Sequence, residues 1–68
     1  MIDVSHGSPY DRGGADSYYR RGRQPHWWPE GTMHGQKIEE KDMTPEQILE
    51  YNMGFDDNEE LGDYKMWD

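Results

Sequence analysis

The chain has 68 residues, a formal net charge of −8 and no cysteine. This length allows one small domain spanning residues 1–68, because two domains normally need well over about one hundred residues. The lack of cysteine excludes disulfides and thiolate metal clusters. No apolar run exceeds three residues, so we expect neither a transmembrane helix nor a signal-peptide core. We therefore expect a protein that stays where it is made.

Few side chains are available to build an apolar core. Only seven are aliphatic or Phe: Ile2, Val4, Ile38, Ile48, Leu49, Phe55 and Leu61. Ordering a chain costs on the order of 1.5 kcal/mol per residue, which so few side chains do not offset. Aromatic residues make up 13% of the sequence, and each ring can bury about 150–250 Å². We therefore expect a thin aromatic core or one completed by a second copy in a homodimer.

Charge is unevenly distributed along the chain. Residues 1–29 hold four Arg and three Asp, a net charge of +1, whereas residues 30–68 hold three Lys and twelve acids, a net charge of −9. The acidic half would repel phosphate, because nucleic-acid binding depends on cations that displace counterions. It would attract a basic partner, or a protein surface built to hold DNA or RNA. We therefore do not expect direct nucleic-acid binding.

The first predicted helix spans about residues 9–20. Ser8 is suited to the N-cap and Pro9 to the first helical position. Two adjacent glycines, Gly13 and Gly14, weaken this helix by about 1 kcal/mol each relative to Ala. We expect close approach of another element at these glycines to compensate.

A connecting loop is predicted over residues 22–43. Residues 23–35 contain two prolines, two glycines and a pair of tryptophans, which are typical of an ordered loop. Residues 32–40 allow one short extended segment or hairpin, with Met33 and Ile38 directed inward.

The second helix is predicted over residues 45–58. Thr44, Pro45 and Gln47 match a capping box with Pro at the first helical position. The amphipathic spacing i, i+3, i+4 and i+7 is then followed by Ile48, Tyr51, Asn52 and Phe55. An acidic and aromatic tail completes the chain at 59–68. The fold class is therefore mainly α, a two-helix domain with an aromatic-rich connecting loop.

Both predicted helices contain the same pattern, Tyr-Asx-x-Gly-x-x-Asp. It begins at Tyr10 in the first helix and at Tyr51 in the second. In each case Gly lies one turn after Tyr, so a ring of one helix could lie over the Gly of the other. Coincidence in a chain rich in Tyr and Gly is the alternative interpretation.

No residue pattern indicates catalysis, a metal site or a cofactor. The paired carboxylates lie in polar runs, where neighbouring residues do not face one another on a helix, and no serine lies in a Gly-x-Ser-x-Gly turn. The histidines His6, His26 and His34 are separated by 20 and 8 residues, which matches no standard metal site. We expect a protein that is not an enzyme.

Arginines and tryptophans lie close together in the first half of the chain, at Arg20, Arg21, Arg23, Trp27 and Trp28. Such a combination occurs in single-strand nucleic-acid platforms, where rings stack on bases. The arginines could instead pair with acids of the same chain or of a second copy, or contact a partner protein. The sequence leaves these three interpretations open.

Partner binding is predicted at two sets of residues. The acidic run Asp56, Asp57, Glu59 and Glu60 would dock electrostatically, either as a partial mimic of DNA phosphates or merely as a solvated face. Aromatic residues and Arg dominate interface hot spots, so the apolar anchors are predicted to be Tyr18, Tyr19, Trp27 and Trp28. Secondary contacts are assigned to Arg20, Arg21 and Arg23.

Several of these segments together resemble small accessory proteins encoded by tailed bacteriophages. The resemblance is carried by residues 8–19 (SPYDRGGADSYY), Pro25-His26, Met43-Thr44 and the Tyr-x-x-Gly-Phe of residues 51–55. It implies a viral protein in the host cytoplasm that acts by occupying a host protein. Some such proteins inhibit restriction and other defence systems, several as acidic DNA mimics. A BREX-type defence factor or a DNA-handling enzyme is therefore the expected target.

The Tyr-x-x-Gly elements are also similar to the helical units of ribosome modulation factors, which are strongly basic, whereas this chain is acidic. An alternative hypothesis is therefore a ribosome- or RNA-associated regulator that uses the Arg/Trp segment. A structural component of the virion is the third hypothesis.

Overall fold

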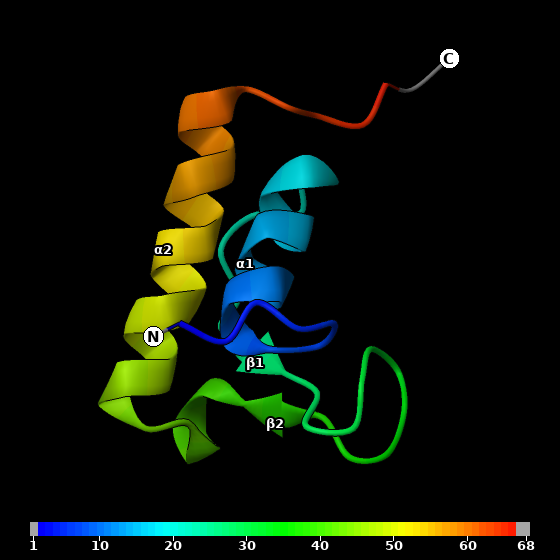
Figure 1. The fold of residues 1–68 in the computed structure, drawn as a ribbon, viewed down its shortest axis with the longest axis vertical. Coiled ribbons are helices and arrows are strands. Elements are labelled where there is room, and N and C mark those ends of the chain that lie inside the picture. Colours follow the sequence, from blue (N-terminus) through cyan, green and yellow to red (C-terminus); the bar gives the residue numbers. More distant parts are fainter. Residues whose placement is uncertain (1, 67–68) are drawn as a thin grey trace.

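The computed structural model describes residues 2–66. It contains helices α1 (Pro9–Tyr18) and α2 (Pro45–Leu61), strands β1 (His26–Trp27) and β2 (Ile38–Glu39), and the short 3-10 helix η1 (Glu40–Asp42). The two helices lie side by side, and the small sheet lies across one end of the pair (Figure 1). The prediction of a small, mainly helical fold with two helices is confirmed. No helix within residues 2–66 is both long enough and apolar enough to cross a membrane.

Helix α1 begins as predicted and ends two residues early. The Ser8 hydroxyl accepts a hydrogen bond from the Asp11 amide at 3.3 Å and so caps the first turn. The helix stops at Tyr18 because Arg20 adopts a left-handed conformation with φ of 58°, which is incompatible with continued α-helix.

Helix α2 has the predicted capping box and extends three residues beyond the predicted end. The Thr44 hydroxyl accepts from the Gln47 amide at 3.1 Å, and the Gln47 side chain accepts from the Thr44 amide at 3.0 Å. At the other end, Gly62 takes a left-handed φ of 73° and its amide donates to the Asn58 carbonyl at 2.8 Å. Because glycine adopts this conformation without steric penalty, the helix continues to Leu61.

The loop between the helices contains the expected short hairpin. Strands β1 and β2 are antiparallel, with His26 opposite Glu39 and Trp27 opposite Ile38. Ile38 is half-buried, in keeping with the predicted inward direction. The prediction for Met33 was wrong, since it lies in a left-handed turn (φ 64°) with its side chain exposed.

The repeated Tyr-Asx-x-Gly-x-x-Asp pattern lies where the two helices touch. A Cβ atom placed on Gly13 would collide with the backbone carbonyl of Tyr51, and one placed on Gly54 would collide with the carbonyl of Tyr10. Each Gly therefore meets the backbone of the other helix, not its tyrosine ring. Only glycine permits so close an approach.

The other residues of the pattern also pair reciprocally between the helices. The Tyr10 hydroxyl donates to the carboxylate of Asp57, and the Tyr51 hydroxyl donates to the carboxylate of Asp16. Each tyrosine is the first residue of one copy of the pattern, and each aspartate is the last residue of the other. The pattern is therefore an interhelical clasp, which explains how a glycine-rich α1 is held.

The core is thin, as the composition predicts, and mostly polar. Only Met43 and Tyr51 are buried hydrophobic residues among those described. The buried polar or charged residues are more numerous: Ser8, Arg12, Asp16, Ser17 and His26. Each of these five makes at least one hydrogen bond, as expected because an unpaired buried polar group costs about 1–3 kcal/mol.

Candidate functional site

A polar network surrounds the buried ring of Tyr51. The Tyr51 hydroxyl donates to Asp16 and accepts from the backbone amide of Gln24 at 2.9 Å. Nδ1 of His26 lies 2.7 Å from the Gln24 carbonyl and 3.6 Å from the Asp16 carboxylate. Burial, together with the hydrogen bond to Asp16, raises the pKa of Tyr51 far above its usual value. The network joins α1, β1 and α2.

Arg12 extends this network and is itself nine-tenths buried. Its Nε–H donates to Nε2 of His26 at 3.2 Å. Because Nε2 accepts, the proton of a neutral His26 ring is on Nδ1, which donates to Gln24. Within residues 2–66, no carboxylate lies within 4.0 Å of the Arg12 guanidinium. Arg12 is therefore a buried cation that lacks an ion-pair partner in the described part of the chain.

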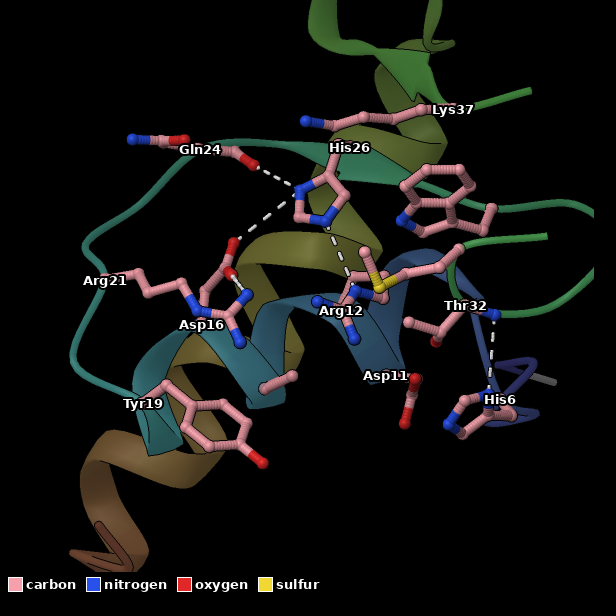
Figure 2. A pocket seen from close by; sticks show the side chains of 13 residues that line it. His6, Asp11, Arg12, Asp16, Tyr19, Arg21, Gln24, His26, Thr32 and Lys37 are labelled. Carbon is pink, nitrogen blue, oxygen red and sulfur yellow. Dashed lines mark hydrogen bonds and ion pairs between the residues drawn. The ribbon is translucent and has the colours of Figure 1, made fainter. Parts of the chain in front are cut away.

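A pocket of about 680 Å³ opens beside Arg12 and His26 (Figure 2). It is built from the N-terminal loop, α1, the loop after α1, β1 and the turn that leads to β2; none of its lining residues belongs to α2. The lining residues with charged or ionisable side chains are His6, Asp11, Arg12, Asp16, Tyr19, Arg21, His26 and Lys37. Trp28, Thr32 and Met33 complete much of the remaining wall.

The predicted acidic run lies on the C-terminal half of α2, and three of its members have partners within the fold. Asp56 pairs with Arg23 at 2.7 Å. Asp57 accepts from Tyr10, which raises the pKa of that tyrosine. Glu59 accepts from the buried Ser17 hydroxyl at 2.5 Å.

Glu60 is the fourth acid, and its side chain makes no hydrogen bond or ion pair with another described residue. All four acids remain exposed. The structure therefore leaves their charges at the surface, while Asp57 and Glu59 also help to join the helices.

Exposed apolar side chains lie next to these acids on the outer face of α2. Leu49 is 59% exposed and Met53 is 38% exposed. The sequence spacing of four, three and four residues from Leu49 through Met53 and Asp56 to Glu60 places all of them on one helical face. We call these four residues the outer face of α2.

The predicted aromatic anchors come from two parts of the fold, the end of α1 and the strand β1 with the residue after it. Tyr18 and Tyr19 pack edge to face at the end of α1, with ring centroids 5.0 Å apart. Trp27 lies in β1 and is half-buried, as is Trp28, which follows it. Tyr19 and Trp28 both line the pocket beside Arg12. Tyr18 and Tyr19 also line a shallow groove with Asn58, which lies between Asp57 and Glu59 on α2.

Each of the three predicted arginines packs against an aromatic ring. Arg20 lies 4.8 Å from the Tyr64 ring centroid, Arg21 lies 4.7 Å from that of Tyr19, and Arg23 lies 4.3 Å from that of Phe55.

Two of these arginines also pair with carboxylates of the same chain. Arg21 lies 3.3 Å from Asp16, and Arg23 lies 2.7 Å from Asp56 and also donates to Asn52 at 2.9 Å. Of the three interpretations left open, intramolecular pairing is the one found for Arg21 and Arg23. Arg21 uses one terminal nitrogen and Arg23 uses both in these contacts, which weighs against an RNA platform built on them.

Sequence reasoning missed Arg12 and the network role of His26. A single Arg beside two glycines carries no local signal, because its burial depends on how α1 packs against the loop that contains His26. For His26 the sequence suggested a metal ligand or a histidine packed in the loop, without a partner on α1. Within residues 2–66, no group of three His, Asp or Glu side chains is placed to hold a metal ion.

Comparison of the chain with protein-family models, curated proteins and solved structures found no match.

Proposed function

We propose that this chain is a small, acidic, non-enzymatic binding protein that inhibits a host protein by covering one of its basic surfaces. The observation that carries the proposal is the outer face of α2, where exposed Leu49 and Met53 lie beside carboxylates. Exposed apolar side chains flanked by charges of one sign are typical of protein-binding surfaces. The described residues provide few cations to neutralise these carboxylates, so the outer face of α2 can attract a basic partner surface.

The arrangement of the carboxylates supports partial mimicry of DNA. Asp57 and Glu60 are three residues apart on a rigid helix, with Asp56 and Glu59 next to them. Such a row presents several negative charges at fixed positions, as a nucleic-acid backbone does. A surface that normally binds phosphates would therefore accept this helix.

The host target proposed on the basis of the phage resemblance is an antiphage defence factor, of restriction or BREX type, or a DNA-handling enzyme in the host cytoplasm. Both classes carry basic surfaces that hold nucleic acid. Occupation of such a surface would block DNA access without any catalytic step.

We also propose that the chain forms a homodimer through the open face of α1. The small residues Gly14 and Ala15 lie there in a shallow groove, between Val4 and the rings of Tyr18 and Tyr19. Val4 is 65% exposed, so burial against a second copy would supply apolar contact that the thin core lacks. Light scattering during size exclusion tests this, with an expected mass of twice the 8.1 kDa of one chain. A strictly monomeric mass contradicts it.

The binding proposal is tested by capture from host cells that express the tagged protein. One host protein should co-purify in stoichiometric amount, and the captured complex should have lost DNA binding. The combined change Asp56→Asn and Glu60→Gln, which removes both carboxylates of the outer face, should weaken the association about tenfold or more, since charge pairs at interfaces contribute on the order of 1.5 kcal/mol or more. The matched control, Glu39→Gln with Asp42→Asn, removes the same charge outside α2 and should leave binding unchanged.

Salt provides a second readout, because attraction between exposed charges is screened as ionic strength rises. Association should therefore weaken with added NaCl. Equal binding by both double variants contradicts docking through α2, and a captured protein that still binds DNA contradicts inhibition by coverage. Recovery of ribosomes or RNA instead would favour the alternative regulator.

A further inference from the structure

The pocket beside α1 is cationic in a molecule that is strongly negative overall. Three permanent cations line it, Arg12, Arg21 and Lys37, against the two carboxylates of Asp11 and Asp16. The chain as a whole has a formal charge of −8. Figure 2 shows Arg21, Lys37 and His6 arranged around the central pair of Arg12 and His26. A local positive region of this kind would concentrate anions.

Neither carboxylate of the pocket neutralises Arg12. Asp11 accepts from the backbone amide of Gly7 at 2.9 Å. Asp16 accepts from Tyr51 and pairs with Arg21. Both acids thus have other partners, and neither lies within ion-pair distance of Arg12.

A buried cation without an anion is costly, since desolvation amounts to several kcal/mol per ion. The Nε–H of Arg12 donates to His26. Its terminal Nη groups make no hydrogen bond with another described residue and are not among the buried atoms that lack a partner, so they are open to solvent in the pocket. A planar guanidinium with free terminal donors matches the oxygens of phosphate or carboxylate in a bidentate manner. An anionic ligand would therefore complete this site.

We propose that this pocket binds a phosphate monoester of the size of a nucleoside monophosphate, with the phosphate group at Arg12. Phosphate is favoured over a single carboxylate because Lys37, which pairs with no carboxylate among the described residues, adds a second positive charge beside Arg12, which suits a dianion. The volume of about 680 Å³ exceeds what a bare anion needs and falls within the range of small-molecule sites. Trp28 and Met33 provide apolar wall for the organic part of the ligand, and an indole stacks well on a nucleobase.

A free nucleotide fits the electrostatics better than a nucleic-acid strand does. A ligand with one phosphate enters the local positive region and leaves the acidic α2 untouched. A polymer would extend its further phosphates over a surface of the same sign, where repulsion opposes binding. This nucleotide site goes beyond the proposed function. Because no pocket residue belongs to α2, an experiment can contradict nucleotide binding and leave the protein-binding proposal intact, or the reverse.

The test is a titration of the ¹⁵N-labelled protein, followed by NMR, with uridine 5′-monophosphate, uridine and inorganic phosphate. The Nε–H resonance of Arg12 is the direct reporter, supported by backbone amides around the pocket. Uridine 5′-monophosphate at up to about 1 mM should shift them. Uridine, which lacks the phosphate, should bind at least about tenfold more weakly, and inorganic phosphate about tenfold more weakly because it lacks the stacking contact.

Two variants test the assignment to this pocket. Arg12→Lys keeps the charge but loses the bidentate geometry, and should weaken binding about tenfold or more. Lys37→Gln changes an exposed side chain that the fold does not need, and should weaken binding about threefold to tenfold. Lys41→Gln removes the same charge from η1, outside the pocket, and should leave the dissociation constant unchanged.

Three results would each overturn the proposal. One is the absence of any shift in the pocket resonances at about 1 mM nucleotide. Another is equal binding by the Lys37→Gln and Lys41→Gln proteins, which remains informative if Arg12→Lys fails to fold. The third is tighter binding of a short oligouridylate than of the mononucleotide, which would assign the pocket to RNA.

Discussion

Tyr10 and Tyr51 occupy equivalent positions in the repeated pattern but differ in burial. Tyr51 is fully buried, and its hydroxyl links Asp16 to the Gln24 backbone. Tyr10 makes the corresponding hydrogen bond to Asp57 at the surface. The two tyrosine hydroxyls thus contribute differently to the free energy of unfolding, because water competes for the exposed hydrogen bond and not for the buried one.

Removal of each hydroxyl should reveal this difference. Tyr51→Phe should lower the free energy of unfolding by about 2–3 kcal/mol, since it leaves the part-buried Gln24 amide without its acceptor and removes one hydrogen bond from the buried Asp16 carboxylate. Tyr10→Phe, the matched control, should lower it by less than about 1 kcal/mol. Chemical denaturation measures both. Equal effects of the two substitutions would show that burial does not distinguish them.

The raised pKa of Tyr51 predicts a loss of stability in alkali. Burial and the hydrogen bond to Asp16 raise this pKa above the usual tyrosine value of 10.0, so the folded state holds the phenolic proton more tightly than the unfolded state. The contribution of protonated Tyr51 to the free energy of unfolding is therefore fully present below about pH 10. Above about pH 10 it is lost by about 1.4 kcal/mol per pH unit.

The Tyr51→Phe protein isolates this effect from the titration of lysines and other tyrosines. Denaturation of both proteins between pH 8 and pH 11 should show a difference in unfolding free energy that shrinks above about pH 10. A difference that stays constant over this range contradicts the assignment to Tyr51.

At the scale of elements, the crossing of α1 and α2 depends on two glycines. Gly13 and Gly54 each lie against the backbone of the opposite helix. Gly14, next to Gly13, has more room: a Cβ atom at this position would lie 3.7 Å from its nearest neighbour, the Gly54 carbonyl oxygen. The adjacent glycines of α1 therefore have different roles, although their intrinsic helix propensity is the same.

Alanine substitutions should separate these roles. Gly13→Ala and Gly54→Ala should each lower the free energy of unfolding by about 3 kcal/mol or more, because the helices must move apart. Gly14→Ala should be neutral or stabilising by up to about 1 kcal/mol, because alanine is the better helix former. Thermal and chemical unfolding measure these changes. A loss at Gly14→Ala as large as at Gly13→Ala would contradict the observed crossing.

At the scale of the whole molecule, acidic residues accumulate where they are least favourable. The last turns of α2 carry Asp56, Asp57, Glu59 and Glu60 at the negative end of the helix dipole. Of these, Asp56 has a cationic partner within residues 2–66. The fold therefore retains charge repulsion that a partner surface would relieve, in keeping with a binding function.

Added salt should stabilise the free protein. Raising the NaCl concentration from low ionic strength to about 1 M shortens the screening length to about 3 Å, which weakens repulsion among the carboxylates more than it weakens the single Arg23–Asp56 pair. An increase in unfolding free energy of about 1 kcal/mol corresponds to a rise of about 4–8 °C in Tm. A fall in Tm with salt would show that attractive pairs outweigh the repulsion.

The sequence alone determined the local features of this protein. Ser8 and the Thr44–Gln47 capping box fixed where the helices start, because capping is a contact between residues at most three apart. Composition determined the thin core and the acidic surface. The repeated Tyr and Gly positions indicated an interhelical contact, though not that backbone carbonyls would meet the glycines.

Only the tertiary structure decided which side chains meet across the chain. It placed Arg12 beside His26 with no acidic partner in residues 2–66, and it brought Tyr19 and Trp28 to the pocket beside Arg12. It also extended α2 to Leu61, because the left-handed Gly62 closes the helix there. Such features depend on packing between segments far apart in sequence, where no local pattern records the burial of a charge or the direction of a side chain.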